Sequence, residues 1–163
     1  MKKLNLKSSL FLICFFLVWL SCNSTDDALD LNLERQLVET TINNSIGWAK
    51  TKDLHLLYSV IANDTNYMEI HPNDRVVNGF KDFTKAEAFW MNPDFKAISY
   101  EIKDLKINFS QRGDVAWFFG MLDDINEWKG QPASWEKTRW TGVLEKRNNK
   151  WIIVQMHFSF ASK

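Results

Sequence analysis

Cysteine is scarce in this chain. Cys14 and Cys22 are the only two thiols among 163 residues, and both precede the first recognisable helix or strand pattern. The rest of the chain can therefore form no internal disulfide and offers no thiol for catalysis or zinc binding. A length of 163 residues suits one globular domain, whose stability must come from packing.

Net charge and cofactor motifs are also absent. Lys and Arg together number 20, as do Asp and Glu, so the formal charge is zero and gives no support for a nucleic-acid partner or an acidic membrane surface. The sequence has no glycine-rich phosphate loop, no serine-nucleophile elbow and no His/Asp/Glu spacing typical of a metal site. We therefore expect neither a cofactor nor a metal ion.

The start of the chain has the pattern of a secretion signal. Lys2, Lys3 and Lys7 form a basic segment, and Leu10–Leu20 is an apolar run too short for a convincing membrane-spanning helix. A small residue followed by Cys22 after such a run resembles a bacterial lipoprotein signal, in which this cysteine becomes the lipidated first residue. An ordinary cleaved signal is the alternative.

This pattern divides the chain into a signal peptide over residues 1–21, a polar tether over 22–30 and a folded domain over 31–163. The mature protein is then expected in the bacterial cell envelope, held at a membrane through the lipid on Cys22, with the outer membrane favoured. If Cys22 carries no lipid, the protein is expected to be secreted.

Hydrophobic periodicity predicts about three helices in the first half of the domain. The first runs from Leu31 to about Ala49, and the second begins at a cap within Thr51–Asp53. The third covers Lys81–Met91 and is closed by an Asn-Pro pair. The buried stripe expected on the first helix consists of Leu33, Leu37, Ile42, Ile46 and Ala49.

Alternating hydrophobicity predicts strands in the remainder. Short strands at Tyr67–His71 and Val76–Gly79 precede a meander of long strands after Phe95. A change of phase near Lys103–Asp104 indicates a β-bulge, and Asn148–Asn149 is typical of a two-residue hairpin turn. Helices followed by such a meander define an α+β domain, in which the helices cover one face of a bent antiparallel sheet.

The alternation also assigns side chains to the two faces of the sheet. The apolar set expected on the covered face is Trp117, Phe119, Met121, Trp140, Leu144, Val154, Met156 and Phe158. The part-polar set expected on the other face is Arg139, Thr141, Trp151, Ile153, Gln155 and His157.

Three stretches resemble the SnoaL-like branch of the nuclear transport factor 2-like superfamily: Gly113–Phe118, Thr141–Leu144, and Trp151–Val154 with His157–Ser159. The resemblance covers about residues 33–162. It implies a cone, in which a curved antiparallel sheet wraps around three helices and leaves a cavity at the wide end. It also implies a homodimer paired through the outer face of the sheet. The interface candidates are then Arg139, Trp151, Ile153, Gln155 and His157.

The implied cavity suggests a ligand site with few polar groups. Its lining candidates are Tyr58, Trp90, Trp117, Phe119, Met121, Trp140, Met156 and Phe158, with Trp128 on a hairpin loop at the mouth. Plain core packing is the alternative for these side chains. An apolar pocket suits a small hydrophobic or aromatic molecule better than acid–base chemistry.

His71 is the main catalytic candidate. It precedes Pro72 at the end of a strand, where steroid-isomerase relatives carry an Asp-Pro pair whose Asp is the base at the cavity mouth. Histidine can act as a general base near neutral pH, although a surface turn is the alternative. The family's oxyanion-binding tyrosine falls near Ser45 and its acidic partner near Gly142, so two of the three parts are missing.

Three functions remain open at this point, and the sequence favours the first of them. The first is a binding module without catalysis, which predicts an apolar cavity without a close pair of titratable groups. The second is an isomerase, hydratase or cyclase that uses His71 with Tyr58 or Asp123, and these groups must then meet in one pocket. The third is an assembly module that works through the outer face of the sheet.

Overall fold

The computed structural model describes residues 30–162. The predicted signal, Cys22 and most of the tether lie outside the described residues. No helix within residues 30–162 combines the length and the hydrophobicity that a membrane crossing needs.

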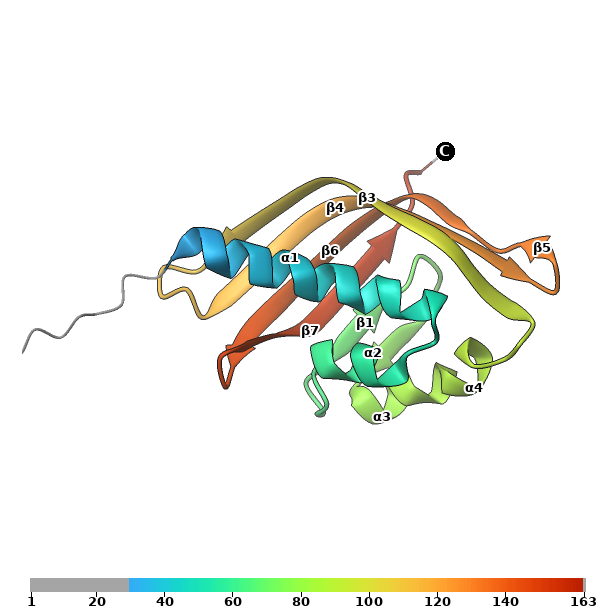
Figure 1. Cartoon of the computed structure of the whole chain (residues 1–163), viewed down its shortest axis with the longest axis horizontal. Helices are drawn as coiled ribbons and strands as arrows, with labels where there is room; N and C mark the ends of the chain where they lie inside the picture. Colours follow the sequence, from blue (N-terminus) through green and yellow to red (C-terminus); the bar gives the residue numbers. More distant parts are fainter. Residues whose placement is uncertain (1–29, 163) are drawn as a thin grey trace, which may run out of the picture.

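The helices gather in the first half of the described chain (Figure 1). They are α1 (Leu31–Gly47), the 3-10 turn η1 (Trp48–Lys50), α2 (Leu54–Val60), α3 (Phe80–Phe83), the 3-10 turn η2 (Thr84–Ala86) and α4 (Glu87–Trp90). The strands are β1 (Met68–Ile70), β2 (Val76–Asn78), β3 (Phe95–Phe109), β4 (Val115–Trp128), β5 (Gln131–Pro132), β6 (Trp135–Arg147) and β7 (Lys150–Ser159).

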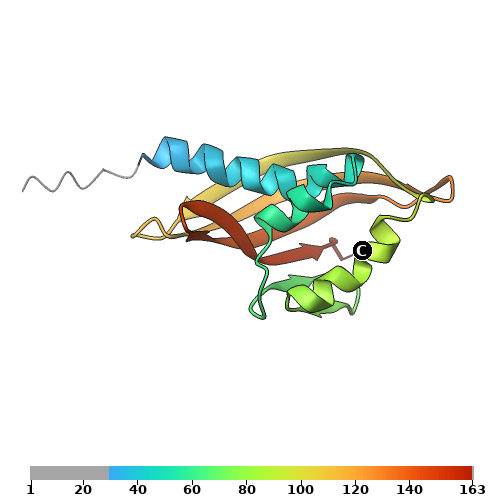
Figure 2. The ribbon, with the colours of Figure 1, turned by 60° about the horizontal axis from the view of Figure 1, so that its bottom comes forward.

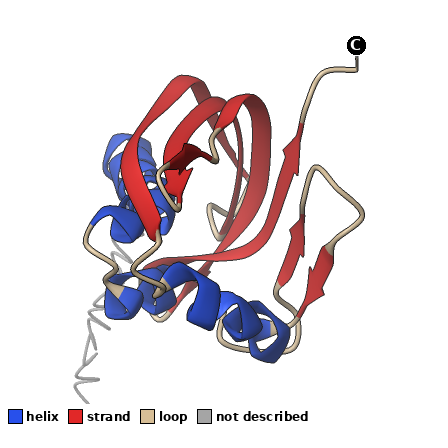
Figure 3. Ribbon diagram, turned by 90° about the vertical axis from the view of Figure 1, so that its right-hand side faces the viewer, coloured by secondary structure: helices blue, strands red, loops and turns tan. Residues whose placement is uncertain are grey.

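All strands belong to one sheet, in the order β2-β1-β7-β6-β4-β3, with the short β5 paired to β4. Every pair is antiparallel except β1 with β7, which is parallel. The long strands curve strongly (Figure 3), and α1 lies across them. Figure 2 shows that the α3–α4 segment lies beside the β1–β2 hairpin, below α1 and α2 in that view. The predicted α+β fold with a curved antiparallel sheet is therefore confirmed.

Several local predictions are also confirmed. Asp53 caps α2, since its carboxylate accepts a hydrogen bond from the backbone N–H of Leu56 at 2.9 Å. The pairing of β3 with β4 shifts register after Lys103, where Asp104 has a left-handed φ of 54°. Asn148 and Asn149 have φ angles of 51° and 61°, the conformation that a tight hairpin turn requires.

The face assignment of β4 is wrong. Ala116, Phe118 and Leu122 face the core, whereas Trp117 is 45% exposed on the outer face. Curvature is the physical reason, because the concave side has little room and small residues must alternate there with large ones. Gly142 on β6 shows the crowding: a Cβ added to it would lie 2.5 Å from Cε1 of Phe118.

The face assignment of β7 is wrong in its first half. The register of β6 with β7 shifts so that Val154 forms a bulge, which turns the residues before it to the opposite face. Trp151 and Ile153 are consequently 3% and 0% exposed and belong to the core, so they are not available to a subunit interface. Gln155 and His157 follow the bulge and stay on the outer face, alternating with the buried Met156 and Phe158.

The buried face of α1 also differs from the expected stripe. Leu33 and Leu37 are exposed, whereas Glu34 is buried. Glu34 is accommodated because its carboxylate accepts hydrogen bonds from the indole N–H of Trp151 at 2.7 Å and from Lys146 at 2.6 Å. The paired carboxylate of Glu34 thus occupies a buried position on α1, where hydrophobic periodicity predicted a leucine.

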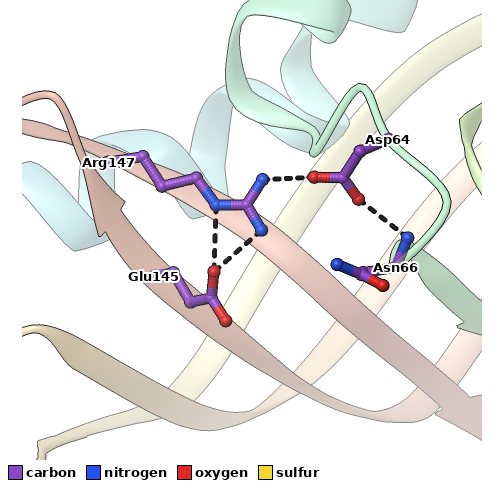
Figure 4. Close-up of polar contacts among 4 residues, drawn as sticks. All are labelled: Asp64, Asn66, Glu145 and Arg147. Atoms are coloured by element: carbon purple, nitrogen blue, oxygen red, sulfur yellow. Dashed lines mark hydrogen bonds and ion pairs between the residues drawn. The ribbon is translucent and has the colours of Figure 1, made fainter.

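An ion network fastens the β6–β7 hairpin to the segment between α2 and β1 (Figure 4). The guanidinium of Arg147 donates to Asp64 at 2.5 Å and, through two nitrogens, to Glu145 at 2.9 and 2.8 Å. Asp64 also accepts from the backbone N–H of Asn66 at 2.8 Å. Both hydrogen bonds lower the pKa of Asp64, and the one from Arg147 has the larger effect. The network holds the approach to β1, which carries the site described next.

Candidate functional site

A cavity of about 450 Å³ opens between the helices and the concave face of the sheet. Aromatic rings form much of its wall: Phe83, Phe89, Trp90, Phe95, Trp135 and Phe158. Polar side chains also line it: Ser45, Glu69, His71, Arg75, Lys85, Asp124 and Asn126. The cavity therefore has the size and the apolar wall of a small-molecule site, with more polar groups than the sequence pattern predicted.

Strand β1 brings a histidine and a glutamate into contact in this cavity. Nε2 of His71 lies 2.9 Å from Oε1 of Glu69. Oε2 of Glu69 accepts a hydrogen bond from the hydroxyl of Tyr67 at 2.7 Å. Glu69 is only 7% exposed, so these two contacts offset the cost of removing its carboxylate from water.

The strand positions explain this cluster. Tyr67, Glu69 and His71 occupy alternate positions, so their side chains share one face of the β1 segment. The imidazole of His71 also packs edge-on against Trp135, with ring centroids 5.7 Å apart. Sequence reasoning missed Glu69, although its alternation with His71 was the signal that could have found it.

Strand β4 contributes a second polar pair, Asp124 and Asn126. Burial raises the pKa of Asp124, and a hydrogen bond with Asn126 partly opposes that rise. Nδ2 of Asn126 lies 3.3 Å from the carbonyl oxygen of Asp124, while its Oδ1 is buried without a hydrogen-bond partner among residues 30–162. An unpaired buried acceptor costs roughly 1–3 kcal/mol, and because Asn126 lines the cavity its Oδ1 is a candidate contact for a ligand.

The structure separates the other catalytic candidates from His71. Asp123 lies on the opposite face of β4 and accepts a hydrogen bond from Lys103 at 2.8 Å. Tyr58 donates to Glu87 at 2.9 Å, and burial with this bond raises its pKa to about 12, but it does not line the cavity. The predicted grouping of His71 with Tyr58 or Asp123 is therefore wrong, and Asp124 takes the cavity position instead.

The predicted ligand-binding residues fall into three groups. Trp90, Met156 and Phe158 line the cavity. Trp140 is buried behind the wall, stacked on Phe158 at 5.6 Å, and Trp128 stacks on the wall residue Phe89 at 5.0 Å. The prediction is wrong for Tyr58, which does not line the cavity, and for three residues that lie on the outer face of β4 because of the alternation described above: Trp117, Phe119 and Met121.

Trp135 is a wall residue that the sequence did not mark. It stands at the first position of β6, and only its packing against His71 and Phe158 reveals its place. Within the described part of the chain, no three His, Cys, Asp or Glu side chains group as a metal ion would require.

Fold and cavity together define a cone-shaped α+β domain of the nuclear transport factor 2-like (NTF2-like) class. A family model described as a SnoaL-like domain matches residues 38–163, and the chain therefore belongs to the SnoaL-like family. Proteins of this family bind small ligands or act as isomerases or dehydratases.

Solved structures support the fold assignment. An NTF2-like superfamily protein from Salmonella enterica is 20% identical, with a TM-score of 0.66 over 82% of this chain and 94% of that one. A proposed dehydratase of the NTF2-like family from Streptomyces avermitilis is 15% identical, with a TM-score of 0.68 over 82% and 99%. An NTF2-like protein from Cytophaga hutchinsonii is 12% identical, with a TM-score of 0.63 over 78% and 98%. At these identities the likeness shows the fold alone, and a search of curated proteins gives no match.

Proposed function

We propose that this protein is a small-molecule enzyme that catalyses a proton transfer of the isomerase or dehydratase type, with His71 as general base. One observation supports the proposal most: inside an aromatic cavity, the imidazole of His71 lies 2.9 Å from the buried carboxylate of Glu69. A module that only binds an apolar ligand needs no such pair. Burying a carboxylate costs free energy, and pairs of this kind gather at catalytic sites.

Glu69 determines which nitrogen of His71 accepts the proton. The carboxylate 2.9 Å from Nε2 favours the tautomer that carries its proton on Nε2, and the lone pair of the neutral ring then resides on Nδ1. When Nδ1 removes a proton from a carbon of the substrate, the new positive charge on the imidazole faces the carboxylate at contact distance. The electrostatic attraction favours the charged ring, as in other base–carboxylate pairs.

Asp124 would act on the substrate oxygen. Burial raises the pKa of its carboxyl group, which therefore keeps its proton to a higher pH than a solvated aspartate does. Below this raised pKa the carboxyl of Asp124 carries a proton, so it can donate a hydrogen bond to a carbonyl oxygen on which negative charge develops, or give its proton to a departing hydroxide. The aromatic wall favours a small aromatic or otherwise apolar carbonyl compound as the substrate.

Deuterium exchange tests this proposal. The purified protein is incubated in D₂O with a panel of small aromatic ketones and β-hydroxy ketones, and NMR follows exchange beside the carbonyl and loss of water. We expect exchange or dehydration of at least one compound. His71→Gln should reduce the rate by about 100-fold or more, since general bases typically contribute that factor.

The matched control is the variant His157→Gln. His157 lies on the outer face of the sheet, so His157→Gln should leave the rate unchanged. The proposal fails if the wild-type protein transforms no member of the panel, or if His71→Gln is as active as the wild type.

Ligand binding without turnover is the second candidate function. Trp90 packs against Trp48 at 5.4 Å, and Trp135 against Phe158 at 5.5 Å, so the wall is a set of interlocked rings suited to an apolar ligand. In this case wild-type protein binds panel members without exchange, and His71→Gln retains the affinity. The same experiment therefore separates the two functions.

The envelope location stays a proposal that rests on the sequence alone. We propose that Cys22 carries a lipid and holds the domain at a bacterial membrane. Cells labelled with radioactive palmitate should incorporate label into the wild-type chain and into Cys14→Ser, but not into Cys22→Ser. Equal labelling of both variants would exclude lipidation of Cys22.

A further inference from the structure

Tyr67 holds the side of Glu69 that His71 does not reach. Its hydroxyl donates to Oε2 of Glu69 at 2.7 Å, while Oε1 contacts Nε2 of His71 at 2.9 Å. Both carboxylate oxygens are therefore engaged, each by a residue two positions away in the chain. Tyr67 itself is 1% exposed and does not line the cavity, so it can influence the reaction only through Glu69.

The surroundings keep this arrangement rigid. Glu69 pairs with Val77 of β2 on one side and with Met156 of β7 on the other, so neighbouring strands fix its backbone. The ring of Tyr67 packs edge-on against Phe83, with centroids 5.0 Å apart. Because neither residue has room to turn away, the hydrogen bond between them is a fixed part of the site.

The hydroxyl of Tyr67 acts as a donor throughout the neutral range. Burial first, and then the charge and the hydrogen bond of Glu69, raise the pKa of Tyr67 well above its usual range. A phenol that keeps its proton stabilises the charged form of the carboxylate to which it donates.

We propose that Tyr67 is a positioning residue that controls, through Glu69, how tightly the Glu69–His71 pair holds its proton. This inference rests on the proposed role of His71 as general base. Without the phenol, Oε2 of Glu69 is left buried and unpaired, which destabilises the proton-free pair most. The pair then binds its proton more tightly, whichever of the two residues carries it.

NMR titration of the histidine ring protons tests this inference without a substrate. Tyr67→Phe removes a single oxygen atom, and the titration midpoint of His71 should rise by about half a pH unit or more. The other charged side chains that line the cavity are Arg75, Lys85 and Asp124, and all remain in the variant. If the enzyme proposal also holds, the pH–rate profile should shift by the same amount.

Tyr58→Phe is the matched control, because it removes the same atom from a tyrosine that donates to Glu87 outside the cavity. It should leave the midpoint of His71 unchanged. The ring signals of His55 and His157 appear in the same spectra and serve as internal references, while His71→Gln identifies the signal of His71.

An unchanged midpoint in Tyr67→Phe would overturn the inference. If that variant does not fold, 3-fluorotyrosine at position 67 replaces it, because it keeps the ring and makes the hydroxyl a stronger donor. The midpoint of His71 should then fall. An unchanged midpoint would again overturn the inference. A shifted midpoint in a protein that transforms no substrate would support the role of Tyr67 and refute the enzyme proposal. The two failures are therefore distinguishable.

Discussion

Asp123 and Asp124 are neighbours in β4 with opposite environments. Burial raises the pKa of Asp124, whereas hydrogen bonds from Lys103 and from the backbone of Lys137 lower that of Asp123. A raised pKa means that the folded state binds the proton more tightly than the unfolded chain. The stabilising contribution of Asp124 is therefore present at low pH and lost as pH rises to the folded pKa. For Asp123 the contribution is present above the unfolded pKa and lost as pH falls.

We therefore expect Asp124→Asn to stabilise the protein by about 1 kcal/mol at about pH 7, because asparagine removes a charge that burial disfavours. The gain should shrink as the pH is lowered to about 4, because the raised pKa lets the buried aspartate take up its proton before that pH is reached. Asp123→Asn is the matched control and should lower stability at neutral pH. Urea unfolding midpoints of both variants at the two pH values give the answer. A stabilised Asp123→Asn beside a destabilised Asp124→Asn would contradict the assigned faces of β4.

Turns, helix caps and one bulge could be predicted from the sequence where a residue type favours a particular local conformation. The Asn148–Asn149 turn needs left-handed backbone, which asparagine tolerates, and the first turn of α2 needs an acceptor such as Asp53. Asp104 combines a left-handed φ with a change of hydrophobic phase, so its bulge was visible in the sequence. Each signal lies within a few residues of the feature it predicts.

Other bulges had no such signal. Val154 bulges in β7, and β6 shifts register against β4 around Lys137, because the whole sheet must bend around the helices. Each bulge reverses the faces of the residues beyond it. That single effect moved Trp151 and Ile153 from the expected interface into the core.

The candidate site was predictable in part for a related reason. His71 was found through its place before Pro72, and the alternation of β1 would also have led to Glu69. Asp124 and Asn126 were not found, because hydrophobic alternation places the bulkiest residues of β4 inside. The end of β4 that borders the cavity instead presents the polar Asp124 and Asn126 inward.

At the scale of the whole molecule, the outer face of the sheet exposes a large aromatic side chain to solvent. Trp117 is 45% exposed there, and a shallow depression beside it is lined by Phe119, Thr141, Val143 and Gln155. Large exposed aromatic side chains on a sheet are typical of protein interfaces. The outer face is thus a candidate subunit contact, built around Trp117 instead of the buried Trp151.

We propose that the protein forms a homodimer through this face. We expect Trp117→Glu to weaken dimerisation by at least about 10-fold, since it removes an aromatic anchor and places a charge that must lose its water in the contact. Leu33→Glu is the control: Leu33 is 50% exposed on α1 and does not belong to this face, so its variant should dimerise like the wild type. Sedimentation equilibrium at micromolar concentration measures both. A monomeric wild-type protein, or a Trp117→Glu variant that dimerises as well as the wild type, would exclude the outer face as the contact.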